Sequence, residues 1–204
     1  MSLLSKITEK PWEHSGEVEA LHGALDNGFS AKRTGLFLFL AVVSSFFGLF
    51  IITYHTRSQF PDWEVLSDPG ILWLNTAILV LASVALQLAS NAAKQHQTSR
   101  MRNALIAGGV LTLAFIAGQL IAWDQMVNAG YYAADNPANA FFYLLTALHA
   151  LHLLGGMWFL LRVGFRMQQT GRGEIVLQSV TLCATYWHYL LIVWLVLFTL
   201  LLRT

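Results

Sequence analysis

Charged residues are scarce in this chain. Only 11% of its 204 residues are Asp, Glu, Lys or Arg, less than half of the roughly 25% that is typical of soluble domains. The formal net charge is +1 without a basic block, which excludes a nucleic-acid-binding protein. A single cysteine, Cys183, excludes an internal disulfide and a thiolate metal cluster. These absences also exclude a disordered chain and an ordinary soluble enzyme.

Apolar residues make up 56% of the sequence and gather in long runs. A transmembrane helix needs about 20 mostly apolar residues, and five such runs contain no Asp, Glu, Lys or Arg: 34–54, 71–91, 103–123, 140–161 and 176–202. One charge at the centre of a span costs about 2.5–3.5 kcal/mol. The sequence therefore predicts an all-α, polytopic membrane bundle of five transmembrane helices. A soluble bundle would need a polar stripe on each helix.

The first part of the chain differs from the rest. Residues 1–33 alternate charged and small residues without the apolar stretch of a signal peptide, and we expect a polar tail there, followed by a transmembrane domain over 34–204. Ten of the twelve Lys and Arg residues would lie on the same side of the membrane as this tail. The positive-inside rule then predicts a cytoplasmic N-terminus and an outer C-terminus.

Polar side chains within the spans are the functional candidates, because lipid offers them no partner. Those expected to bind lipid or to bond between helices are Asn75, Thr146, His149, His152, Trp187, His188 and Trp194. The steps of three from Thr146 to His149 and His152 put these three residues on one helix face. The favoured interpretation is that the three histidines are neutral and hydrogen-bonded between helices or to nearby hydroxyls.

Two other interpretations of the histidines stay open from the residues alone. His152 and His188 could hold a haem as a bis-histidine pair, and all three histidines could bind zinc or copper. No acidic residue in the spans supports a metal site or acts as an acid or base, and no phosphate-binding loop is present. The sequence predicts no catalytic residue, cofactor or metal in this chain.

Basic residues flank the spans at the predicted inner interface. Arg33, Lys94, Arg100 and Arg102 are expected to help hold anionic phospholipid head groups. Each such residue gains about 1 kcal/mol near an anionic leaflet.

Five motifs follow one another along the chain. Residues 184–198 (ATYWHYLLIVWLVLF) are similar to the pattern YWHF-x-D-x-VW-x-x-LF. Residues 141–156 (FFYLLTALHALHLLGG) resemble FY-x-x-TG-x-HG-x-HV-x-GG, and 74–79 match LNTAIL. Residues 36–50 are similar to LFLASE-x-MFFG-x-LF, and Gln119 with Trp123 resembles Q-x-x-E-[YW]. In this order the five motifs resemble subunit III of the haem–copper terminal oxidases in its five-helix form.

Three acids of the family pattern are apolar in this chain. The family's glutamates fall on Val43 and Ala122, and its aspartate falls on Leu191. Any role that those carboxylates have in proton uptake or in reacting with carbodiimide does not carry over to this sequence.

The resemblance implies a non-catalytic accessory subunit of a respiratory haem–copper oxidase. Such a subunit packs directly against subunit I, shares the complex with subunit II, holds phospholipids, stabilises the catalytic site and supports proton uptake. Haem and copper would belong to the partner subunits, and the location would be the bacterial inner (plasma) membrane. We further expect a lipid-filled cleft with the first two spans on one side and the last three on the other.

Three alternatives accompany this interpretation. One is a five-helix subunit associated with nitric-oxide reductase, and another is a membrane cytochrome that binds haem b. A transporter is disfavoured because the spans lack intramembrane charge and broken helices.

Overall fold

The computed structural model describes residues 31–63, 70–169 and 173–202. These ranges contain five helices and no strand: α3 (Ala31–Arg57), α4 (Ile71–Lys94), α5 (Thr98–Asn128), α6 (Pro137–Gln169) and α7 (Gly173–Leu202). Each of the five is long and apolar enough to cross a membrane. The predicted all-α class with five spans is therefore confirmed, whereas the tail over 1–30 lies outside the described residues.

The helices extend beyond the apolar runs that predicted them. α5 begins at Thr98 rather than at 103 and ends at Asn128 rather than at 123, and α6 continues past 161 to Gln169. Hydropathy marks only the hydrocarbon core of a bilayer. Helical hydrogen bonding continues through the interface, where water and head groups solvate polar side chains.

The short turn between α4 and α5 closes with a left-handed residue that is not glycine. His96 has a φ of 56°, and its neighbour Gln97 donates its backbone N–H to the Ala92 carbonyl over 2.9 Å. With the bond from His96 N–H to the Ala93 carbonyl, this pattern is a Schellman cap. The cap reverses the chain within a few residues, so α4 and α5 become antiparallel neighbours.

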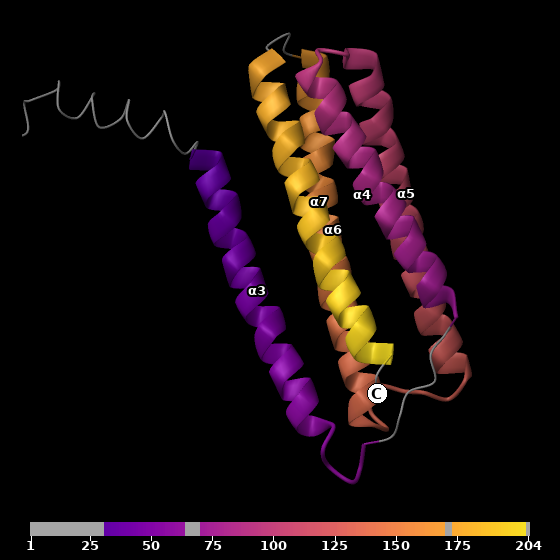
Figure 1. Ribbon diagram of the computed structural model, residues 1–204. Coiled ribbons are helices and arrows are strands. Elements are labelled where there is room, and N and C mark those ends of the chain that lie inside the picture. Colours follow the sequence, from indigo (N-terminus) through magenta and orange to yellow (C-terminus); the bar gives the residue numbers. More distant parts are fainter. Residues whose placement is uncertain (1–30, 64–69, 170–172, 203–204) are drawn as a thin grey trace, which may run out of the picture. The chain divides into compact units, whose positions relative to one another are not determined.

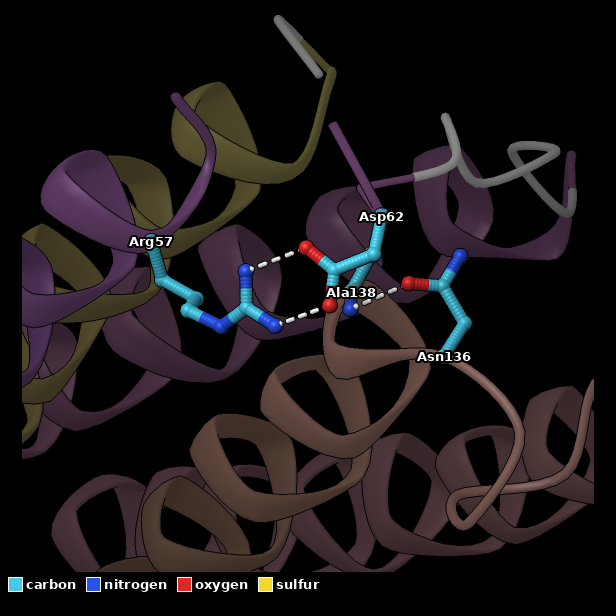
Figure 2. Close-up of polar contacts among 4 residues, drawn as sticks. All are labelled: Arg57, Asp62, Asn136 and Ala138. Carbon is cyan, nitrogen blue, oxygen red and sulfur yellow. Dashed lines mark hydrogen bonds and ion pairs between the residues drawn. The ribbon is translucent and has the colours of Figure 1, made fainter. Parts of the chain in front are cut away.

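The start of α6 is fixed by its sequence. Pro137 occupies the first helical position, where its fixed φ suits a helix and its missing N–H is not needed. The side-chain oxygen of Asn136 accepts a hydrogen bond from the backbone N–H of Ala138 over 2.9 Å (Figure 2). This arrangement satisfies one of the free donors at the helix N-terminus.

The described residues from Val42 onward form one compact unit, and those from Ala31 to Ala41 belong to another, so each is described by itself. In the larger unit α4 packs against both α5 and α7, while α6 packs against α5 and α7 (Figure 1). The expected grouping of the second span apart from the last three is wrong, because α4 shares its interfaces with two of them.

An aromatic cluster joins the C-terminal part of α3 to the start of α6. The ring of Tyr54 lies edge-on to the rings of Trp63 and Phe141, with centroid distances of 4.9 and 5.4 Å. Beside this cluster the guanidinium of Arg57 donates to both carboxylate oxygens of Asp62 (Figure 2). That hydrogen bonding lowers the pKa of the Asp62 carboxyl, so the ion pair persists until the pH falls below the ordinary range of an aspartate.

Two adjacent glycines in α6 have opposite surroundings. A Cβ at Gly156 would lie 2.6 Å from a ring atom of Tyr186 and 3.0 Å from the Trp187 indole, so α7 packs directly on this backbone. A Cβ at Gly155 would meet nothing within 4 Å. Small residues at such contacts allow membrane helices to approach closely.

We predict that Gly156→Ala destabilises the bundle and that Gly155→Ala does not. The added methyl at residue 156 must displace a packed aromatic ring, at a cost of about 1–3 kcal/mol. At residue 155 the same methyl favours the helix, since alanine exceeds glycine by about 1 kcal/mol in helix propensity. Thermal unfolding of both variants in the same detergent measures the difference, and equal midpoints would contradict the packing.

Candidate functional site

Three tryptophans donate their indole N–H groups to threonine hydroxyls across helix interfaces. The donor–acceptor distances are 2.9–3.0 Å. The pairs are Trp123 with Thr146 (α5 to α6), Trp187 with Thr112 (α7 to α5) and Trp194 with Thr76 (α7 to α4). These indole–threonine pairs therefore connect α4, α5, α6 and α7 to one another. Thr112 is the one member of these pairs that the motifs in the sequence do not mark, because it lies in an unremarkable apolar run.

Each of these threonines also donates a hydrogen bond within its own helix. Thr76, Thr112 and Thr146 bond to the backbone carbonyl four residues earlier, over distances of 2.8, 2.8 and 2.6 Å. The threonine hydroxyl donates its proton in this bond, so its oxygen can only accept, and it accepts the proton of the indole N–H. In a membrane each polar group must find its partner inside the protein, and this arrangement satisfies both groups.

His188 bridges α7 to α4. Its Nε2 lies 2.9 Å from the side-chain oxygen of Gln87, which can only accept, so Nε2 carries the proton. Its Nδ1 then accepts from the hydroxyl of Ser83 over 2.5 Å. Further along the same interface the hydroxyls of Ser90 and Thr181 are 3.3 Å apart.

Small hydroxyl residues recur every seven positions on α4. Thr76, Ser83 and Ser90 each contact α7 through a side-chain hydrogen bond. A spacing of seven keeps residues on one side of a helix that packs along an antiparallel neighbour. We call this row of contacts the α4–α7 polar seam.

Ser83, His188 and Gln87 are hydrogen-bonded in series, as the three residues of a hydrolase catalytic triad are. Their surroundings, however, are not those of an active site. Ser83 is buried in the middle of α4, where the neighbouring backbone amides are engaged in helical hydrogen bonds. Such amides cannot point at an oxyanion, which acyl transfer requires. The arrangement therefore joins helices rather than forming a nucleophile.

The two histidines of α6 have different surroundings. His152 bonds through Nδ1 to the Leu148 carbonyl of its own helix over 2.7 Å, and its backbone carbonyl accepts from the Tyr186 hydroxyl of α7 over 2.9 Å. His149 is fully buried, yet neither of its ring nitrogens has a hydrogen-bond partner among the described residues. The described residues therefore do not supply the interhelical hydrogen bond expected of His149.

The remaining predicted positions divide into buried and exposed ones. Asn75 is fully buried beside α5, where a Cβ at Gly118 would overlap its amide oxygen, and it too has no hydrogen-bond partner within the described ranges. Arg33 is exposed, with its guanidinium 5.7 Å from the Phe37 ring. The exposed basic residues around the α4–α5 turn are Lys94, Arg100 and Arg102.

The histidine geometry bears on the haem and metal alternatives. Both ring nitrogens of His188 are occupied by Ser83 and Gln87, and a haem ligand needs one of them free. Within the ranges that the structure describes, no three His, Cys, Asp or Glu side chains gather as a possible metal site. The positions of two missing family acids, Val43 and Ala122, are buried.

Five membrane-length helices, joined by side-chain hydrogen bonds across their interfaces, define the class of polytopic helical membrane proteins. The family model of cytochrome c oxidase subunit III matches residues 17–203. The chain therefore belongs to the cytochrome c oxidase subunit III family.

Individual relatives carry the same family name. The chain is 28% identical over 191 residues to cytochrome c oxidase subunit 3 of Synechocystis sp., covering 91% of this chain and 79% of the relative. It is 26% identical over 172 residues to that of Thermostichus vulcanus, covering 82% and 84%. It is 29% identical over 180 residues to that of Triticum aestivum, covering 81% and 66%.

We predict that His188→Leu destabilises the bundle and that Thr185→Val has little effect. The leucine removes both hydrogen bonds across the α4–α7 polar seam, each worth about 0.6–2 kcal/mol in membrane proteins. Thr185 instead bonds over 3.0 Å to a carbonyl of its own helix, and valine keeps its shape. Unfolding of the two variants in bicelles measures the difference, and equal stability would show that the two hydrogen bonds of His188 do not stabilise the bundle.

Proposed function

We propose that this chain is the non-catalytic accessory subunit III of a respiratory haem–copper oxidase, which reduces O2 to water and translocates protons. The observation that carries the proposal is the use of the chain's intramembrane hydrogen-bonding groups. The three indole–threonine pairs and both nitrogens of His188 hold helices together rather than facing a substrate. Membership of the subunit III family supports the same role.

The proposed partners follow from the family. Subunit I is the direct neighbour, subunit II shares the complex, and these partners carry the haem and copper. In this arrangement the chain stabilises subunit I and supports proton uptake. Because Val43, Ala122 and Leu191 replace the family's acids, its contribution to proton uptake does not pass through carboxylates at these positions.

Charge supports an orientation and a lipid role. Lys94, Arg100 and Arg102 are exposed around the α4–α5 turn. The positive-inside rule places this turn and the N-terminus on the cytoplasmic side of a bacterial inner membrane, with the C-terminus outside. Together with Arg33, these residues are suited to hold anionic phospholipid head groups, while the exposed apolar faces of the helices contact acyl chains.

The experiment that tests the proposal is affinity purification of the tagged full chain from its native membranes. We expect native mass spectrometry to find it with a haem- and copper-containing subunit I. The chain released from that complex should show no Soret absorbance. Recovery with a nitric-oxide reductase instead, or a haem that stays on the isolated chain, would contradict the proposal.

A further inference from the structure

Three fully buried polar side chains on three different helices have no hydrogen-bond partner within the described residues. They are Asn75 on α4, Gln119 on α5 and His149 on α6, with exposed fractions of 0%, 1% and 0%. Both side-chain polar atoms of each residue are unpartnered. Buried polar groups in native proteins are almost always hydrogen-bonded to protein or to ordered water, so these three need a partner.

Contacts around Asn75 and His149 place both residues at one level of the bundle. The His149 ring is 5.8 Å from the Phe115 ring and 5.2 Å from the Trp194 ring, and these two aromatic rings are 4.9 Å apart. Trp194 donates to Thr76, the residue that follows Asn75. The Asn75 amide in turn lies against the backbone of Gly118, three residues after Phe115.

Gln119 belongs to the same level. It follows Gly118 directly, and it lies one helical turn from both Phe115 and Trp123 on α5. Phe115 contacts His149, while Trp123 bonds to Thr146, one turn before His149 on α6. The Gln119 turn of α5 therefore faces the His149 turn of α6.

The neighbouring polar groups are already used. The Trp194 and Trp123 indoles donate to Thr76 and Thr146, and both threonine hydroxyls donate to carbonyls of their own helices. The side-chain amides of Asn75 and Gln119 each need acceptors for two N–H groups and a donor for the oxygen. The neutral imidazole of His149 needs one acceptor and one donor. An acyl chain supplies neither, whereas water supplies both.

We propose that Asn75, Gln119 and His149 hold one or more internal water molecules between α4, α5 and α6, at the level of Phe115 and Trp194. The water donates to the amide oxygens and to the unprotonated imidazole nitrogen, and it accepts from the amide and imidazole N–H groups. All three residues belong to this chain. A test of the water site therefore gives its answer separately from any test of the proposed function.

Water-edited solid-state NMR of the full chain in lipid bilayers tests the site. Polarisation should pass from water to the side-chain nitrogens of His149 and Gln119 severalfold faster than to Nε1 of Trp187. Trp187 is the matched reference because it is equally buried but bonded to a protein hydroxyl, that of Thr112. Transfer to His149 no faster than to Trp187 would overturn the proposal, as would a direct Gln119–His149 hydrogen bond.

A pair of variants separates bound water from general loosening. Asn75→Leu keeps the branched shape of the side chain but removes both polar atoms, and it should abolish the fast transfer to His149. Ser90→Ala changes another buried polar residue of α4, one whose hydroxyl has a protein partner in Thr181, and should leave the transfer unchanged. If Asn75→Leu does not fold, the comparison of His149 with Trp187 in the unaltered chain still decides the outcome.

Discussion

The absence of water from a bilayer is the constraint on which this structure depends. A buried indole N–H in that setting must find an acceptor on another helix, and a threonine hydroxyl supplies it while donating to its own backbone. The same three-part unit of indole, hydroxyl and carbonyl occurs at Trp123, Trp187 and Trp194. Each unit joins a different pair of helices, so the orientation of four helices is specified by directional bonds.

Close packing and polar bonding reinforce each other in α7. Trp187 donates to Thr112 on one side and packs over the bare backbone of Gly156 on the other. The next residue in the same helix, His188, adds its two hydrogen bonds to α4. A helix held this way can present a fixed outer face to a neighbouring subunit without carrying a reactive group of its own, which suits an accessory role.

The sequence predicts the spans well and their pairing poorly. Uncharged runs are a local property, so five helices follow from hydropathy, although α5 and α6 extend past the runs because helices continue into the interface. The bond from Trp194 to Thr76 joins residues 118 positions apart, and no local pattern indicates it. Helix pairing depends on such long-range contacts, and neither hydropathy nor the family resemblance indicates that α4 packs against α5 and α7. The expected cleft between the second span and the last three is therefore wrong.

For the candidate residues, too, the sequence indicates which side chains are polar but not which partners they meet. The sequence marks Thr146, Trp187, His188 and Trp194 as polar groups within spans, since polarity in an apolar run is visible without a fold. It does not indicate which of them have partners. His149 and His152 lie three residues apart on one helix, yet among the described residues only His152 of the two has a hydrogen-bond partner for its ring.

Hydrogen–deuterium exchange of the tryptophan indoles, followed by NMR on the full chain in nanodiscs, tests whether the indole–threonine pairs hold the bundle together. We expect the indole protons of Trp123, Trp187 and Trp194 to exchange slowly, because they are released only when helices separate. Trp73, exposed near the start of α4, should exchange much faster. Exchange of the three bonded indoles at the rate of Trp73 would show that these bonds do not hold the bundle together.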